Sequence, residues 1–322
     1  MFHDAYGYFE ERYADKQETE SDGDLDDLYD RQFLGWLWTA CVEPILKEIT
    51  GLQPSSPTPR IWWIGTGIAT GFPFHAAGNS EGGTLDCAIS SYIPSITSLM
   101  EARARTKRSG NDGDKTSVLV VTTPGDSDGG QRPDLAEALQ GMDETYGETF
   151  TAVTLSEPSI EETLERMGGF DVVHFACDGH SDSFNPSQSY LQVGKHLSSS
   201  ADEGKLTAEL ISEDENLDKP QVAFLSLHPS AEDRTETPTD EGLGIISAFQ
   251  VAGFRHALGS LSKAGGASQA YVSKSFYQAL RENRSGEAAD HLVAKALHDA
   301  LRSARDHEND PHCWAPYTHS GP

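Results

Sequence analysis

The sequence predicts an α/β fold in which a mostly parallel sheet carries helices on both of its faces. Short apolar runs bounded by turn residues have the length of buried strands, and amphipathic stretches long enough for helices lie between them. Parallel strands need crossover connections, which are usually helices, so this alternation predicts strands that run in one direction. In such a sheet, ligands and catalytic groups collect beyond the carboxyl ends of the strands.

The elements follow one another from residue 31 onward. Residues 31–50 place apolar side chains at helical spacing, which predicts a helix with one buried face made of Phe33, Leu34, Leu37, Trp38, Cys41, Val42 and Ile45. The expected strands cover residues 61–64, 117–123, 149–154, 171–176, 221–227 and 254–261. The expected helices cover residues 85–105, 131–142, 158–168, 241–253, 267–283 and 286–305.

The charge of the chain is strongly negative and unevenly placed. In 322 residues, 51 acidic and 24 basic side chains give a net charge of -27. Residues 1–30 alone carry 11 acidic and 2 basic side chains, so we expect residues 1–32 to form a mobile acidic segment. A field of this sign repels phosphates and anionic lipids, and no basic patch offsets it. We therefore expect neither a nucleic acid nor a membrane as a partner.

Targeting signals and paired cysteines are not apparent in the sequence. No apolar run approaches the ~20 residues of a membrane-spanning helix, and the polar start is unlike a secretion signal, so we expect a cytoplasmic protein. Cysteines at positions 41, 87, 177 and 313 lack the short paired spacing of a disulfide framework or a zinc ribbon.

Two features of the sequence suggest cofactor or metal sites, and both are weak. Gly65, Gly67 and Gly71 follow the first expected strand, but the third glycine is displaced from the dinucleotide pattern and Pro73 stands where a helix should begin. We expect a tight turn there and no cofactor. The donors of a metal site gather at two strand ends, but strand alternation turns Cys177 away from the others, so we expect no metal: His174, Cys177, Asp178, His180 and His228.

The same strand ends carry a resemblance to a known family. The run VVHFACDGHSDSFNPSQSYL, residues 172–191, is followed by AFLSLHPS, by DEGLGIISAFQVAGFRHALGSL and by the terminal WAPYTHSG. In this order the blocks resemble the CHAT domain, a caspase-like peptidase module related to separase, in the form found in fungi. The resemblance runs from about residue 33 to the end. It implies one domain over residues 33–322 with a three-layer α/β/α caspase-like fold.

The resemblance also implies where catalysis would occur. The family reads HFACHG in the first block and LSAC in the second, with the histidine as base or orienter and the cysteine as nucleophile. The family histidine falls on Asp178 and the family cysteine falls on His228, so both positions are substituted here. Since neither substitute can perform the lost task, the resemblance implies a pseudopeptidase. Asp178 and His228 are expected to form a charge-assisted hydrogen bond.

A cleft that survives this loss would still bind a partner. The expected cleft residues, in part matched to the family's loop after its histidine and to the acidic start of the next helix, are His174, Gly179, His180, Asp182, Asn185, Ser189 and Asp240. The partner implied is a polypeptide or a protein domain, for example the tandem-repeat or sensor domains of a longer chain. His174 also fits a core position in its strand.

A rearranged hydrolase is the alternative interpretation. Cys177 lies beside the family position and His228 could act as its base, or Asp178 and His228 could orient Ser226 or Ser230. Strand alternation counts against Cys177. The serines lack the sharp glycine-flanked turn that commonly exposes a nucleophile. A third interpretation is a purely structural or interaction role, in which the domain is a regulatory lid or an effector neighbour within a longer protein.

Overall fold

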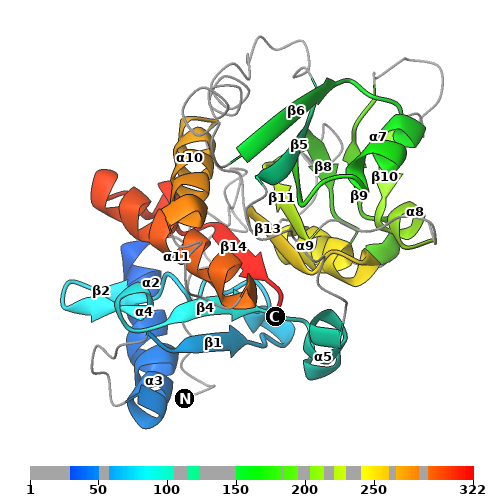
Figure 1. Ribbon diagram of the computed structural model, residues 1–322. Helices are drawn as coiled ribbons and strands as arrows, with labels where there is room; N and C mark the ends of the chain where they lie inside the picture. The colour runs from blue at the N-terminus through cyan, green and yellow to red at the C-terminus, as the bar shows by residue number, and fades with distance from the viewer. Residues whose placement is uncertain are drawn as a thin grey trace, which may run out of the picture.

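A computed structural model describes residues 30–50, 58–104, 115–123, 150–182, 185–194, 204–213, 221–229, 241–260, 266–282 and 289–322. Across these residues the main feature is an eight-stranded sheet in the order β1-β4-β14-β13-β11-β7-β5-β6. In that order the strands are Arg60–Trp63, Ile89–Tyr92, Tyr317–Ser320, His256–Ser260, Val222–Leu225, Val172–Ala176, Thr116–Thr122 and Phe150–Ser156. Figure 1 shows this sheet crossing the molecule.

The sheet consists of two parallel parts joined at one antiparallel contact. β13, β11, β7, β5 and β6 pair in parallel, and so do β14, β4 and β1. Only β13 and β14 pair in antiparallel fashion. The expected α/β fold with a mostly parallel sheet is therefore confirmed.

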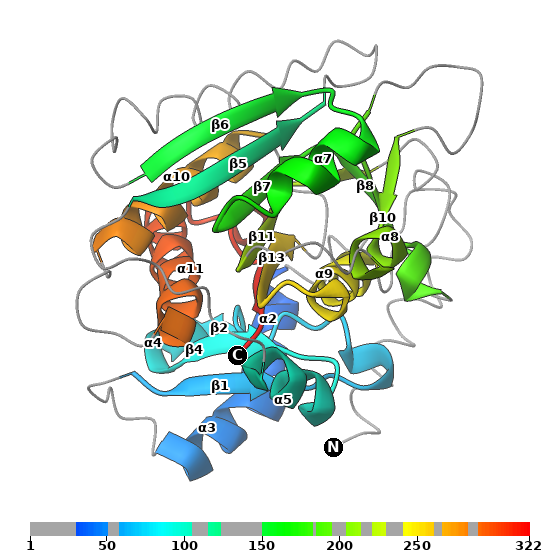
Figure 2. The same ribbon diagram turned by 45° about the vertical axis from the view of Figure 1, so that its right-hand side comes forward.

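Helices cover both faces of the sheet, as Figure 2 shows. On one face lie α7 (Ile160–Met167), α8 (Ala208–Glu213) and α9 (Glu241–Ala252); on the other lie α2 (Arg31–Leu37), α3 (Glu43–Thr50), α10 (Gly266–Glu282) and α11 (Ala289–His307). Strand alternation separates the two cores. Phe175 of β7 contacts Phe249 of α9 edge to face, whereas Phe224 of β11 contacts Phe276 of α10. The result is a three-layer α/β/α arrangement.

The first helix shows how a local irregularity changes which residues are buried. A π-helical segment, Trp38–Val42, joins α2 to α3. A π-turn contains one more residue than an α-turn, so the buried stripe moves by one position. Leu46 is fully buried, while Ile45 is 45% exposed. The expected burial of Ile45 was therefore wrong, whereas Val42, the last residue of the π-helical segment, is buried as expected.

Residues 85–105, expected as one helix, form three elements. They are α4 (Thr84–Cys87), the strand β4 and α5 (Ile96–Ala104). β4 lies between β1 and β14, so pairing on both sides outweighs the local helical spacing. The helix expected at residues 131–142 lies outside the described residues. Among the described helices, none has both the length and the apolar character that crossing a membrane requires.

Two smaller sheets complete the described part of the chain. One has the order β10-β9-β8-β12, with strands Lys205–Thr207, Tyr190–Gln192, Asp178–His180 and His228–Pro229. The other is a hairpin of β2 (Gly78–Asn79) and β3 (Gly82–Gly83). Short 3-10 turns occupy Gly67–Ala69, Pro186–Gln188 and Pro311–Cys313. Gly65 packs so closely on the first turn that a Cβ atom would lie 2.3 Å from the Ala69 carbonyl oxygen.

Candidate functional site

The two positions that the family resemblance assigns to catalysis, Asp178 and His228, lie side by side. β7 and β11 are parallel neighbours at the centre of the main sheet, and the chain passes from each directly into the smaller sheet as β8 and β12. β8 and β12 are also parallel, and their register pairs His228 with Asp178 and Pro229 with Gly179. Neighbouring strands lie about 4.8 Å apart. The backbone therefore brings together the two positions that the sequence singled out.

His174 lies in the core of the protein rather than on the wall of a cleft. Its side chain is 0% exposed, and its ring stacks on Phe224 with centroids 4.4 Å apart. One ring nitrogen, Nδ1, lies 3.1 Å from the Tyr277 hydroxyl, and the other, Nε2, lies 2.8 Å from the Ser226 hydroxyl. Burial lowers the pKa of His174 to about 3, so the imidazole is neutral and has one donor and one acceptor for these hydroxyls.

These hydrogen bonds among His174, Tyr277 and Ser226 give Ser226 a structural role in the core. The serine is 1% exposed, and its backbone N–H donates to the Phe175 carbonyl at 2.9 Å. A hydroxyl beside an imidazole is the pairing that a nucleophilic serine needs, but this one has no open surface on which a substrate could lie. Ser226 thus pairs with His174, a partner that the sequence analysis did not foresee. Ser230 lies outside the described residues.

Cys177 occupies the opposite face of the sheet. Its side chain is 0% exposed and belongs to the core cluster beneath α7, α8 and α9, together with Val173 and Phe175. Alternation along the strand places it away from His174, which contacts α10 through Tyr277. The thiol is therefore inaccessible to a polypeptide substrate.

Gly179 and His180 continue from Asp178 along β8. A Cβ atom on Gly179 would lie 2.7 Å from Leu227 Cδ1, so the absence of a side chain lets the residue before His228 pack here. The centroid of the His180 ring lies 5.1 Å from that of the Tyr190 ring across the β8–β9 pair. The Lys205 ammonium lies 4.6 Å from the centroid of the same Tyr190 ring. His180 and Lys205 are half-buried and Tyr190 is buried, so these groups pack together in the smaller sheet next to Asp178.

Three more of the expected cleft residues, Asp182, Asn185 and Ser189, are linked by hydrogen bonds. The Asp182 N–H donates to the Ser189 hydroxyl at 3.0 Å, and the Asn185 N–H donates to Asp182 Oδ1 at 2.8 Å. Ser189 is buried, whereas Asn185 is exposed. The trio shapes the backbone that leads from β8 to β9. Asp240, the last residue of the expected cleft, lies outside the described residues.

Helix α10 contributes polar side chains that the sequence did not single out. Gln269 donates from Nε2 to the Leu227 carbonyl at 3.1 Å, and Tyr277 pairs with His174. Gln269, Ser273 and Tyr277 are all buried and recur every four residues, so they share one face of the helix. Polar residues at the spacing of a buried face are the signal that could have identified them. Among the described residues, no group of three or more histidine, cysteine, aspartate or glutamate side chains could hold a metal ion.

Comparisons with solved structures identify proteins of similar fold. The Arg-specific cysteine proteinase gingipain R is similar in structure, with a TM-score of 0.56 and 10% identity over 93% of this chain and 74% of that chain. Saccharomyces cerevisiae separase in complex with securin has a TM-score of 0.45 and 14% identity over 79% of this chain. The chain spans 15% of that separase chain. The comparison with curated proteins gave no match.

A family model gives the more specific result. The model for the CHAT domain matches residues 31–322, which include every described strand and helix from Arg31 onward. The match begins at the first described helix and continues through β14. Because the family model covers most of the length of the chain, this chain belongs to the CHAT domain family.

Proposed function

We propose that this CHAT domain is a pseudopeptidase: a binding or regulatory module that engages a polypeptide without cutting it. The observation that carries the proposal is the register of β8 and β12, which pairs His228 with Asp178. These are the positions that the family resemblance assigns to a catalytic histidine and cysteine. An imidazole and a carboxylate in these places provide no thiolate to attack an amide carbonyl.

The burial of neighbouring nucleophiles supports the same conclusion. A rearranged hydrolase would need Cys177 or Ser226 to reach a substrate carbonyl and a base at once. Cys177 is packed in an apolar core on the far face of the strand, and Ser226 is engaged by His174 inside the protein. Either residue would need a large rearrangement of the central sheet before it could act.

The surface beside the family positions suits an extended polypeptide. β12 is the last strand in the order β10-β9-β8-β12 of the described residues. Backbone groups at the edge of a sheet can pair with an added strand of a bound polypeptide. We propose that the bound polypeptide belongs to a partner domain, including tandem-repeat or sensor domains of a longer chain. None of the four cysteines is in a disulfide, which fits a proposed cytoplasmic setting.

The test compares three forms of the full chain. They are the native chain, a variant restored to the family pattern by Asp178→His with His228→Cys, and a matched control with Asp178→Ala and His228→Ala. Each is incubated with a fluorogenic peptide library, and self-cleavage is followed by mass spectrometry. We expect cleavage by the restored variant alone. The peptide that it cleaves should bind the native chain in a fluorescence anisotropy titration without being cut.

Two results would contradict the proposal. Cleavage by the native chain that is lost in Cys177→Ala or in His228→Ala would show that the site is a rearranged peptidase. If the restored variant folds with the native circular dichroism spectrum but neither cleaves nor binds any peptide, the surface is not a polypeptide site.

A further inference from the structure

A cavity lies on a different part of the molecule from the substituted family positions. It is formed by the start of α2, the β2–β3 hairpin, the end of α11 and the 3-10 turn Pro311–Cys313 with the residue that follows it. Its volume is about 580 Å³. Pockets that hold small molecules commonly enclose about 300 to 1,000 Å³. In Figure 1, α2 and β2 lie on the opposite side of the main sheet's centre from β8, where the family positions are.

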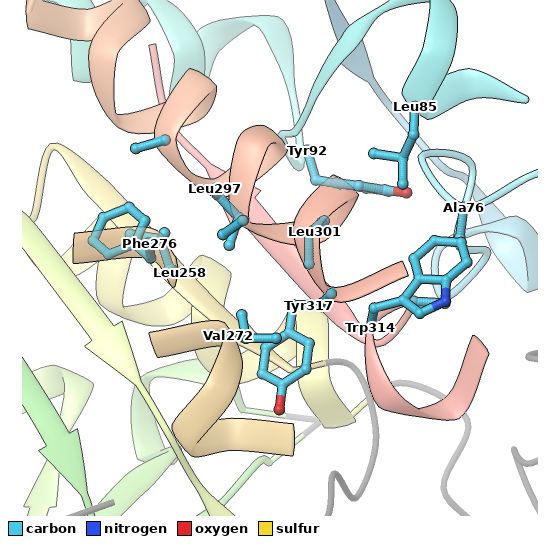
Figure 3. Close-up of a cluster of buried hydrophobic side chains, with 14 of the residues drawn as sticks. Ala76, Leu85, Tyr92, Leu258, Val272, Phe276, Leu297, Leu301, Trp314 and Tyr317 are labelled. Atoms are coloured by element: carbon cyan, nitrogen blue, oxygen red, sulfur yellow. The ribbon is translucent and has the colours of Figure 1, made fainter. Parts of the chain in front are cut away.

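Apolar side chains and close backbone form most of the cavity wall. Leu34, Ala76, Leu85 and Trp314 all line it and are buried. Figure 3 shows the Trp314 ring beside Ala76, at the edge of the buried cluster that joins α10 to α11. Within the hairpin wall the backbone is tightly packed, since a Cβ atom on Gly83 would lie 2.7 Å from the Ala77 carbonyl oxygen. Such a wall suits a flat apolar body.

One buried donor in this wall has no partner. Trp314 is 6% exposed, and its Nε1–H has no hydrogen-bond partner among the described residues. An indole nitrogen is only a donor, and a buried donor that stays unpaired costs about 1 to 3 kcal/mol. A ligand with a hydrogen-bond acceptor at this place would remove that penalty. The unpaired indole is therefore an observation that points to a ligand, independent of the cavity's shape.

The charges that line the cavity select the sign of the ligand. Arg305 is matched by Asp86, with guanidinium-to-carboxylate distances of 2.9 and 3.2 Å. Arg31 also lines the cavity, and one of its nitrogens donates to the Asn309 carbonyl, a neutral group. A guanidinium has five N–H donors, so Arg31 retains donors and its full positive charge. His75, also in the wall, is neutral because burial lowers its pKa to about 4.

We propose that this cavity is a binding site for a small organic anion, a carboxylate or a phosphate ester with a flat apolar body. The body lies against Trp314 and Leu34, and the anionic group is held by Arg31. Nε1–H of Trp314 is closed to solvent and unpaired in the structure, and a small turn of the indole ring on binding brings it to an acceptor atom of the ligand. The site is separate from the proposed polypeptide surface, so it supplies a second ligand to the same domain.

The test uses simple probes on the full chain labelled with ¹⁵N. Benzoate and phenyl phosphate are titrated separately, and benzyl alcohol serves as the neutral probe of similar shape. The indole N–H resonance of Trp314, assigned by its loss in Trp314→Phe, reports binding. We expect a saturable shift of this resonance with at least one anion. Benzyl alcohol should bind at least tenfold more weakly, and the stronger of the two anions identifies the carboxylate or the phosphate class.

Matched variants separate the site from general attraction of anions. Arg31→Gln should weaken the anion at least fivefold and leave benzyl alcohol unchanged, and Arg31→Lys should recover part of the loss. Lys47→Gln makes the same change of charge on exposed α3 and should have no effect. The proposal is overturned if neither anion shifts the Trp314 resonance saturably, if benzyl alcohol binds equally well, or if Arg31→Gln behaves like Lys47→Gln while retaining the native melting temperature.

Discussion

The carboxyl ends of β7 and β11 and the cavity beside α2 differ in how their buried polar groups are satisfied. At the strand ends, both ring nitrogens of His174 meet hydroxyl groups. In the cavity wall, the Trp314 indole N–H meets no partner among the described residues. A completed set of hydrogen bonds stabilises the fold and leaves no ring nitrogen of His174 for a ligand to pair with. An incomplete set beside an open volume is a place where a ligand gains free energy.

The strand ends also show that the usual position of a functional site need not hold an accessible nucleophile. Parallel α/β sheets concentrate functional groups at the carboxyl ends of their strands. Here the strand ends hold a buried cysteine and a buried serine, beside Asp178 and His228, the positions that the family resemblance assigns to catalysis. On the proposed function, these strand ends keep the location of a peptidase site without its nucleophile. Four predictions test this contrast, in order of decreasing expected effect.

Removing His174 should have the largest effect on stability. His174→Ala removes the ring that stacks on Phe224 and leaves the hydroxyls of Tyr277 and Ser226 unpaired. We expect the free energy of unfolding to fall by about 3 to 5 kcal/mol, measured by urea denaturation. Ser226→Ala, which removes one hydrogen bond, should cost about 1 kcal/mol. A loss below that of Ser226→Ala would mean that the trio does not hold the strand ends together.

Acid should destabilise the protein through its buried neutral histidines. Burial lowers the pKa of His298 to about 4, with Asp299 opposing this and Arg302 assisting it. The unfolded chain takes up the proton near pH 6.5 and the folded chain does not, so stability falls as pH drops from about 6.5 to 4. The slope for one such group is about 1.4 kcal/mol per pH unit. Stability is unaffected by this group above pH 7.

His298→Leu should therefore reduce the slope of the unfolding free energy against pH by the contribution of one proton, about 1.4 kcal/mol per pH unit. The urea midpoint, measured at intervals between pH 7.5 and 4.5, gives this slope. At pH 7.5 the substitution should change the free energy of unfolding by less than about 1 kcal/mol, because Nδ1 of His298 has no hydrogen-bond partner among the described residues. His307→Gln, at an exposed position, is the control and should leave the slope unchanged. An identical slope in His298→Leu and the native chain would contradict the prediction.

Crowding β8 against Leu227, which lies between β11 and β12, should lower the stability of the protein by a smaller amount. Gly179→Ala puts a Cβ atom 2.7 Å from Leu227 Cδ1. The Leu227 side chain can shift at some cost, so we expect a loss of about 1 to 2 kcal/mol in thermal or urea denaturation. Leu227→Ala should remove the clash, and the double variant should then be more stable than the sum of the single losses predicts. Simple additivity would show that the two side chains do not compete for this space.

The smallest effect should come from the ion pair at the cavity. Asp86→Asn removes the charge that matches Arg305 but keeps an oxygen for the Gly83 N–H, which lies 3.0 Å from Oδ2. A partly exposed pair of this kind contributes about 0.5 to 1 kcal/mol to stability. The freed guanidinium should strengthen binding of the anionic probe about threefold in the same titration. Weaker binding in Asp86→Asn would place the anion away from Arg305.

The sequence predicted the strands that have apolar patterns and missed those that do not. Residues 117–123 were expected as a strand and β5 covers Thr116–Thr122. β14, Tyr317–Ser320, is buried throughout yet mostly polar. Its His319 lies 3.0 Å from the His256 ring, and its Ser320 donates to the Tyr92 carbonyl at 2.9 Å. Hydrogen bonds across strands replace apolar burial here, and no local pattern reveals them.

The order of residues by itself determined the α/β class, the core-facing alternation and the resemblance to the CHAT domain, because these depend on spacing and residue type within short segments. Only the tertiary structure decided that β8 and β12 pair in register, that His174 is enclosed by hydroxyls from β11 and α10, and that Trp314 keeps an unpaired donor beside a cavity. Each of these depends on contacts between residues about 50 to 100 positions apart, or on the absence of such a contact. A chain's local pattern carries no record of which distant groups will meet.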